Sequence, residues 1–259
     1  MRILFIADIV GGPGRRGLAA GMPALHERWK PDAVIANGEN AAGGLGITEK
    51  TAEEIFATGV DAITLGNHAY RHRDAYEYLD RCERIVRPAN YPAGNPGRGQ
   101  MVLDVGERRL GILNLSGSVE LRVARTPFPV ADAALRALGD AGADTILVDF
   151  HAEVTSEKVA MGWHLDGRVA ACLGTHTHVP TADARVLPKG TAFVSDVGMT
   201  GARASVLGVR IEQALEAFRT QMPVRFDTAD EDVWINAVLV TTRSDGLAES
   251  IDQILEPVG

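Results

Sequence analysis

Two histidines separated by one residue, His176 and His178, follow an apolar run that ends at Leu173. Side chains two positions apart on an extended backbone point to the same side, so the two imidazoles can reach one point. Gly174 lets the chain turn sharply between the apolar run and the histidines. Neutral imidazole is the commonest metal ligand in proteins, so the spacing favours a metal-binding pair, although two loop histidines on the surface would give the same pattern.

Polar side chains that could bind a metal also follow four other apolar runs. They are Asp8, the pairs Glu39-Asn40 and Asn67-His68, and His151. Taken singly, the acidic and amide residues could cap helices or form turns, and His151 could be a core histidine bonded to a backbone carbonyl. Strand ends meet at one edge of an α/β sheet, so a shared metal site explains all of these residues with one cause.

The kinds of donor in this set indicate which metals would bind and how many. Carboxylate, amide oxygen and imidazole together suit borderline first-row metals, such as Fe, Mn or Zn, better than Ca²⁺ or Mg²⁺. The donors are too many for one tetrahedral ion. We therefore expect two metal ions that are bridged by a carboxylate.

Apolar runs predict the strands that must position these residues. Runs typical of buried strands lie at 2–7, 33–36, 62–65, 145–150 and 169–173, and a short one lies at 85–86. Residues 101–105 and 110–115 flank Gly106 and predict an antiparallel hairpin. Further strands are predicted at 184–187, 191–194, 234–240 and 251–255.

Helices are predicted between many of these strands. They begin after Gly14, run from Thr48 to Gly59, follow Asp74, cover 132–138 and begin again near Ser156. The order of elements predicts an α/β (α+β) fold, in which a mixed sheet, or two sheets packed face to face, carries helices on the outside.

The composition is that of an ordinary globular protein. The chain has 259 residues, of which 46% are hydrophobic and 23% charged, and we expect one domain that spans 1–259. The net charge of −8 argues against general nucleic-acid binding, although bound cations could still attract a small phosphate. No apolar run approaches the ~20 residues that cross a bilayer. Cys82 and Cys172 indicate reduced thiols, as in a cytoplasmic protein.

The same residues, in the same order, resemble the motifs of the calcineurin-like metallophosphoesterases. The opening Asp-x-His of that superfamily is Asp8-Ile9-Val10 here, its Gly-Asp is Gly38-Glu39, and the acidic residue that often follows Gly-Asn-His is Ala69. These departures are similar to the YmdB-type branch of phosphodiesterases, as are residues 37–44, NGENAAGG, and 195–201, SDVGMTG. The resemblance extends from Met1 to about Gly201.

The resemblance implies a di-iron or related binuclear centre, with Mn or Zn as other choices, and hydrolysis of 2',3'- or 3',5'-cyclic nucleotides by a metal-bridging hydroxide. Glu39 would bridge the two metals. Asp8, Asn40 and His178 would complete one site, and Asn67, His151 and His176 would complete the other. Asn40 would then bind where the superfamily's histidine is missing. His68 would bind no metal and would protonate the departing ribose oxygen, unless it only contacts the phosphate.

Two other functions fit the same residues. A phosphomonoesterase such as a nucleotidase uses the same centre, and a regulatory protein could hold a metal or nucleotide without turnover. His68 argues against the second, because a binding protein needs no proton donor. Glu153 and Asp196 could orient ligand imidazoles or form caps and turns, and Asn90-Tyr91 could contact a base or end a loop. The physiological substrate stays open, as does a possible homo-oligomer.

Overall fold

The computed structural model describes residues 1–121 and 125–258. The N-terminal strand β1 (Arg2–Ile6) is buried on both of its faces. Ile3 and Phe5 lie in one apolar core, and Leu4 and Ile6 lie in another. This alternation follows from the period of two in a strand, and it requires that both faces of the sheet are covered. The sheet that contains β1 is therefore an inner layer of the molecule.

The first sheet has eight strands and mixes parallel with antiparallel pairing. Its order is β2-β12-β13-β1-β3-β4-β5, and β14 also pairs with β13. Neighbours among β1, β3, β4 and β5 are parallel, so their carboxyl ends lie at one edge of the sheet. The bounds of the other strands are β2 (Asp8–Ile9), β3 (Ala33–Asn37), β4 (Ala62–Thr64), β5 (Ile85–Val86), β12 (Met199–Ala202), β13 (Val233–Thr242) and β14 (Ala248–Pro257).

The second sheet has six strands in the order β10-β11-β9-β8-β7-β6. β7, β8 and β9 are parallel neighbours, and β9 is also parallel to β11. The predicted hairpin is confirmed, since β6 and β7 pair antiparallel. The bounds are β6 (Gln100–Val105), β7 (Arg108–Ser116), β8 (Thr145–His151), β9 (Ala171–Thr175), β10 (Arg185–Val186) and β11 (Ala192–Val194).

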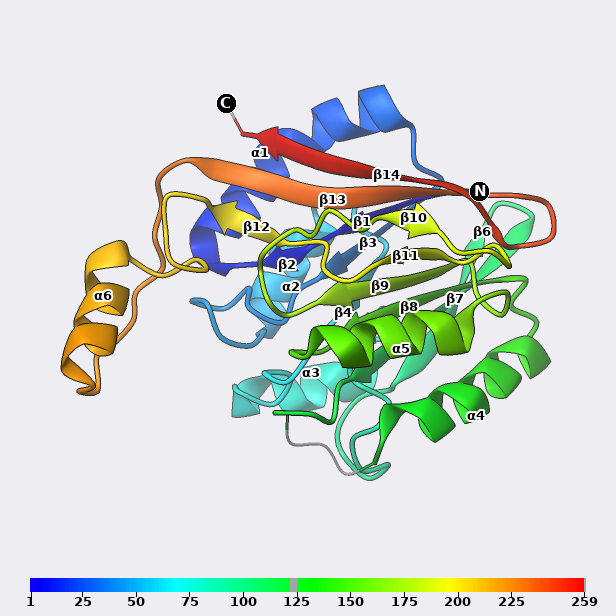
Figure 1. Ribbon diagram of the computed structural model, residues 1–259, viewed down its shortest axis with the longest axis horizontal. Coiled ribbons are helices and arrows are strands. Elements are labelled where there is room, and N and C mark those ends of the chain that lie inside the picture. The colour runs from blue at the N-terminus through cyan, green and yellow to red at the C-terminus, as the bar shows by residue number, and fades with distance from the viewer. Residues whose placement is uncertain (122–124, 259) are drawn as a thin grey trace.

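The two sheets pack face to face and helices cover their outer faces, which confirms the predicted fold class. Phe5 and Ile35 of the first sheet share a core with Leu147 and Leu173 of the second. Outside the first sheet lie α1 (Gly11–Trp29), α2 (Glu49–Phe56) and α3 (Tyr76–Arg81), which follows the short 3₁₀ helix η1 (Arg73–Ala75). Outside the second lie α4 (Pro127–Asp140) and α5 (Thr155–Leu165), on the opposite side of the molecule from α1 (Figure 1).

Several elements differ from the sequence prediction, among them the short strand β2, which lies where a loop was expected. Helix α1 begins at Gly11, within the stretch expected to be a loop, because Pro13 lies in the first turn, where a helix tolerates proline. Strand β12 and helix α6 (Ile211–Thr220) were not predicted. Figure 1 shows α6 standing apart from both sheets, and Phe218 on it is 78% exposed. Its apolar residues therefore do not mark a core helix.

Some properties concern the whole chain. Both cysteines are free thiols, and Cys172 is buried in β9. Within the described ranges, no helix combines the length and apolar character needed to cross a membrane. That the chain forms one domain over 1–259 stays a prediction.

Candidate metal centre

Strands of both sheets deliver the predicted residues to one place. Asp8 begins β2, Glu39 and Asn40 follow β3, and Asn67 and His68 follow β4. From the second sheet, His151 ends β8, and His176 and His178 follow β9. Contacts at 2.9 to 3.8 Å link these side chains into one cluster: Asp8, Glu39, Asn40, Asn67, His68, His151, His176 and His178.

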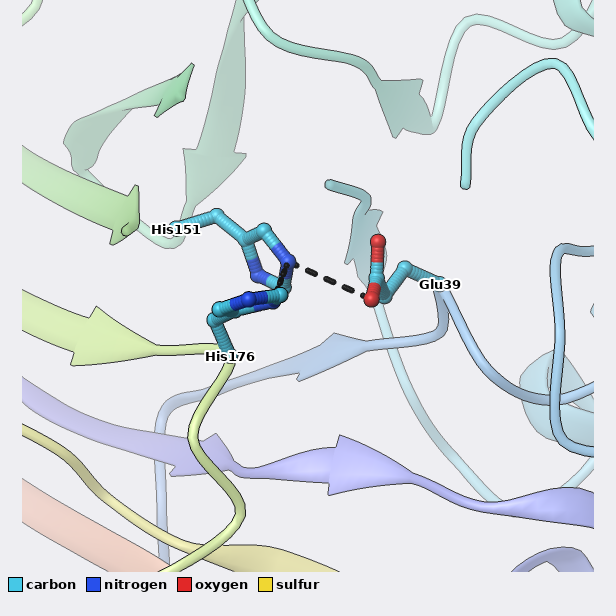
Figure 2. A group of neighbouring side chains, drawn as sticks. All are labelled: Glu39, His151 and His176. Carbon is cyan, nitrogen blue, oxygen red and sulfur yellow. Dashed lines mark hydrogen bonds and ion pairs between the residues drawn. The ribbon is translucent and has the colours of Figure 1, made fainter. Parts of the chain in front are cut away.

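The Glu39 carboxylate lies at the centre of the cluster and is fully buried. Its Oε1 is 3.2 Å from His151 Nε2 and 3.2 Å from His68 Nδ1, and it accepts a hydrogen bond from Asn40 Nδ2 at 3.0 Å. Figure 2 shows this carboxylate facing the imidazoles of His151 and His176, and donor atoms of these three residues lie within 4.8 Å of one another. Glu39 thus has the central position that a bridging ligand requires.

One side of the cluster consists of Asn67, His151 and His176. His151 Nε2 lies 2.9 Å from Asn67 Oδ1 and 3.0 Å from His176 Nδ1. Gly66 permits this crowding, because a Cβ at that position would come within 2.3 Å of both Glu39 Oε2 and His151 Nε2. Any larger residue at position 66 would push the Glu39 carboxylate away from the imidazole of His151.

The other side consists of Asp8, Asn40 and His178. His178 Nε2 lies 3.1 Å from Asn40 Nδ2 and 3.8 Å from Asp8 Oδ1. Asp8 is fully buried, and within the described part of the chain its Oδ1 has no hydrogen-bond partner. A buried carboxylate oxygen without a partner is costly, and a cation would satisfy it.

Hydrogen bonds outside the cluster fix which nitrogen each imidazole presents. Thr175 Oγ1 donates to Asp149 Oδ1 at 2.7 Å, so it accepts from His151 Nδ1 at 2.9 Å. His178 Nδ1 donates to the carbonyl of Leu207 at 3.0 Å. Both imidazoles therefore turn Nε2 toward the cluster, and this is the nitrogen that would bind a metal once it is deprotonated.

Glu153 and Asp196 support the two histidines that follow β9 in different ways. Glu153 Oε2 lies 3.0 Å from His176 Nε2, which leaves His176 Nδ1 to face His151. Asp196 instead holds the backbone, since its Oδ2 accepts from the backbone N–H of Thr177 at 3.0 Å. Asn90, which could have contacted a base or ended a loop, is fully buried and bonds to Ser116, as a residue with a structural role in a loop does.

The turn that carries the two histidines is strained. The φ angles of His176 and His178 are 103° and 65°, a region that residues other than glycine seldom adopt. Lys158 of α5 helps to hold the turn, because its Nζ is 2.6 Å from Asp196 Oδ2 in a buried ion pair. The sequence analysis missed Lys158, Asp149 and Thr175. Thr175 contacts His151 directly, whereas Asp149 acts through Thr175 and Lys158 acts through Asp196.

The electrostatics of the cluster favour added positive charge. Burial alone would raise the pKa of Glu39, but the charge of His151 outweighs it and holds this pKa well below its usual range. Burial raises the pKa of Asp8 to about 6. Burial opposes protonation of His151, yet Glu39 and Asp8 raise its pKa to about 9. His176 differs, since burial and the His151 charge lower its pKa to about 3.

The cluster opens into a pocket of about 350 Å³. Glu39, Glu153 and Asp227 line it together with His68, and none of its lining residues in 1–121 or 125–258 is lysine or arginine. Such a pocket would repel a phosphate anion unless cations were bound in it. The convergent carboxylate, amide and imidazole groups, the unpartnered Asp8 oxygen and this charge pattern all fit a site for metal ions.

Two mixed sheets between layers of helices, with metal donors at the strand ends of both sheets, define a metallophosphoesterase. Residues 4–254 match the YmdB-like protein family. The 2',3'-cyclic-nucleotide 2'-phosphodiesterase of Bacillus subtilis (strain 168) is 45% identical over 242 residues, which cover 93% of this chain and 90% of that protein. This chain belongs to the YmdB-like family.

Solved structures agree with this assignment. A hypothetical protein from Thermus thermophilus is 41% identical, with a TM-score of 0.93 and 100% coverage of both chains. A phosphatase from Mycoplasma pneumoniae is 31% identical, with a TM-score of 0.92, over 99% of this chain and 93% of that one. The predicted superfamily, branch and enzyme class, a phosphoric diester hydrolase, are confirmed. The metal-binding and catalytic roles of the individual residues stay predictions.

Proposed function

We propose that this chain is a phosphodiesterase with two metal ions that hydrolyses 2',3'-cyclic nucleotides, 3',5'-cyclic nucleotides or both. The supporting observation is the cluster of donors around Glu39 at the base of a pocket that has carboxylates and no lysine or arginine among its described lining residues. The similarity to a 2',3'-cyclic-nucleotide 2'-phosphodiesterase supports the choice of substrate. Free thiols support a cytoplasmic location.

The contacts suggest how the cluster would divide between two ions. Glu39 would contact both. Asp8, Asn40 and His178 would hold one ion, and Asn67, His151 and His176 the other, with iron as our first choice and Mn or Zn as alternatives. Bound ions would supply a water of lowered pKa as the nucleophile and neutralise charge on the phosphoryl oxygens.

His68 would supply the proton that the departing ribose oxygen needs. Its backbone N–H donates to Glu39 Oε2 at 3.0 Å, which fixes the residue beside the cluster. Its Nδ1 lies 3.2 Å from Glu39 Oε1, a carboxylate oxygen that can only accept, so Nδ1 is the donor in that contact and Nε2 is left for the substrate. His68 also lines the pocket, where its imidazolium form, with hydrogens on both nitrogens, would give the Nε2 proton to the oxygen as the P–O bond breaks and would be left as neutral imidazole.

The number of metal ions is the first test of this proposal. Protein purified without added metal should contain two ions per chain. Glu39→Ala should disturb both ions, because Glu39 contacts both halves of the cluster, whereas His178→Ala should mainly remove one. His26→Ala, which removes an exposed histidine of α1, is the matched control and should keep both. One ion or none in the native protein, with no gain on reconstitution, would contradict a binuclear centre.

Substrate comparison separates this function from its alternatives. The metal-loaded protein should hydrolyse 2',3'-cyclic AMP or 3',5'-cyclic AMP faster than the monoester AMP. Faster release of phosphate from AMP would instead identify a nucleotidase. Binding of cyclic nucleotide with two metals present and no turnover would identify a regulatory binding protein.

A further inference from the structure

The pocket above the metal cluster has a second, apolar wall. Leu45, Leu207, Val209 and Phe226 line the same pocket as Glu39 and His68. Three of these side chains are far from buried, since Leu45 is 42% exposed and Leu207 and Phe226 are each 51% exposed. Large apolar side chains gathered at the mouth of one pocket are typical of a binding surface rather than of chance exposure.

Three of the four wall residues, Leu207, Val209 and Phe226, lie in the two chain segments that flank α6, and Leu45 lies in the loop after β3. Val209 pairs with Thr228, Arg210 N donates to the carbonyl of Asp227 at 3.1 Å, and Ala229 N donates to that of Gly208 at 2.9 Å. These bonds hold residues 207–210 and 226–229 together at the base of α6, and we call this pair of segments the neck. The sequence analysis assigned no role to these residues.

The neck also forms a hydrogen bond with a predicted metal ligand. The Leu207 carbonyl accepts the hydrogen bond from His178 Nδ1, so one residue supports a ligand and lines the apolar wall. Thr228 packs over the glycine loop after β3, because a Cβ on Gly44 would lie 3.1 Å from its Cγ2. The apolar wall therefore has a fixed position relative to the metal cluster.

We infer that this wall is the nucleobase subsite of the enzyme, with Phe226 as the residue on which the base stacks. The inference rests on the proposed function. A phosphodiester bound at the metal donors leaves the neutral, flat base as the part that can fill an apolar wall. Aromatic side chains recognise bases in this way, because every base has a π face.

The wall offers little that could read the edge of a base. Phe226 is followed by Asp227, whose Oδ2 accepts from Gln213 Nε2 at 2.8 Å, a bond that draws this carboxylate toward α6. Stacking without hydrogen-bond readout is tolerant of sequence. The subsite should therefore accept all four bases, and should favour purines, which stack over a larger area.

Substrates with and without a base provide the test. Phe226→Ala should raise KM for 2',3'-cyclic AMP by about 10-fold, the weakening expected when one base–aromatic stack is lost, and should leave kcat near the native value. Hydrolysis of 1-O-methylribose 2',3'-cyclic phosphate, which has no base, should be unchanged. Phe226→Trp should restore the native KM, and Phe218→Ala, on an exposed phenylalanine of α6 outside the pocket, should have no effect.

Binding can be followed without turnover. In saturation-transfer NMR, the base protons of adenosine should receive more saturation from the native protein than the ribose protons, and Phe226→Ala should abolish the difference. Leu45→Ala should reduce it. Equal loss of activity on both substrates, or an unchanged adenosine signal in Phe226→Ala, would overturn the subsite. Native protein that hydrolyses neither substrate would overturn the proposed function, whereas the adenosine experiment would still report on the subsite.

Discussion

Asp8 carries the least satisfied polar atom of the cluster. Its Oδ1 is buried and, among the described residues, accepts no hydrogen bond, and burial raises its pKa to about 6. Across the cluster, His151 is held protonated by the carboxylates around it, with a pKa of about 9. Without metal, protons on these side chains supply part of the positive charge that metal ions would supply. Protons and metal ions therefore compete for the same atoms.

This competition predicts how metal affinity depends on pH. Metal binding requires Asp8 ionised and His151 neutral, so affinity should rise as pH rises through 6 and on toward 9, and activity should fall in acid. At pH 7 Asp8 has already lost its proton, so metal binding should release the proton of His151 and, where the bound water ionises, a second proton. Titration calorimetry in buffers of different ionisation enthalpy measures this release. A binding enthalpy that does not depend on the buffer would contradict it.

His68 is the residue that distinguishes an enzyme from a binding protein. His68→Ala should keep both metals and bind product phosphate, yet lose about 100-fold or more in kcat on a ribose-leaving cyclic nucleotide. The loss should shrink for a nitrophenyl diester, because nitrophenolate leaves with scarcely any need for a proton. Metal analysis and kinetics on both substrates check this. Equal losses would make His68 a phosphate-binding residue, and loss of metal would make it a ligand.

At the scale of elements, helix α5 fixes the turn that follows β9. Lys158 and Asp196 form a buried ion pair, with side chains only 2% and 1% exposed, and Asp196 in turn holds Thr177 between the two histidines. Such a pair matters chiefly because removing one partner leaves the other charge buried alone. The strained φ angles of His176 and His178 depend on this support.

We therefore expect Lys158→Met to lower the free energy of unfolding by about 3–5 kcal/mol, because the Asp196 carboxylate loses its counter-charge. Metal affinity should weaken as well, since the turn is released. Adding Asp196→Asn should recover part of the stability, because no unpaired charge remains. Urea unfolding and metal titration measure both effects. Lys50→Met, on an exposed lysine of α2, is the control, and equal stability of the two variants would contradict the prediction.

The strand ends could be predicted from the sequence, because apolar runs stop abruptly at polar residues. Asp149 could not, since it lies inside such a run, between Val148 and Phe150. Its link to His151 passes through Thr175, which the register of β8 against β9 sets opposite His151. Sequence patterns do not determine the register between two parallel strands that are far apart in the chain. Hydrogen bonds such as the one between Thr175 and His151 can therefore be identified only from the structure.

Helix α6 shows a different limit of sequence analysis. Ile211, Leu215 and Phe218 have the spacing of one helical face, which is a signal that could identify the helix. Those residues are exposed, so the pattern does not report burial in a core. The apolar wall beside α6 was equally hidden, because its residues come from three separated segments of the chain.

At the scale of the whole molecule, the packing of the two sheets assembles the centre. Glu39 follows a strand of the first sheet and His151 ends a strand of the second, and they meet at 3.2 Å. Neither sheet holds a complete set of donors. The apolar core between the sheets, which includes Phe5 and Leu147, therefore also sets the spacing of the predicted ligands.

The hydrogen bond from His178 to the carbonyl of Leu207 joins the metal cluster to the apolar wall. If occupancy of the wall steadies Leu207, it also steadies the imidazole, and thermodynamic reciprocity requires that each event favours the other by the same factor. We expect adenosine to bind about 5-fold or more tightly to metal-loaded than to metal-free protein, a typical size for such coupling. NMR titration of both forms measures it, and equal affinities would contradict it. The enzyme would then hold its metals most tightly while a nucleoside is bound, so that an occupied pocket protects the centre from loss of metal.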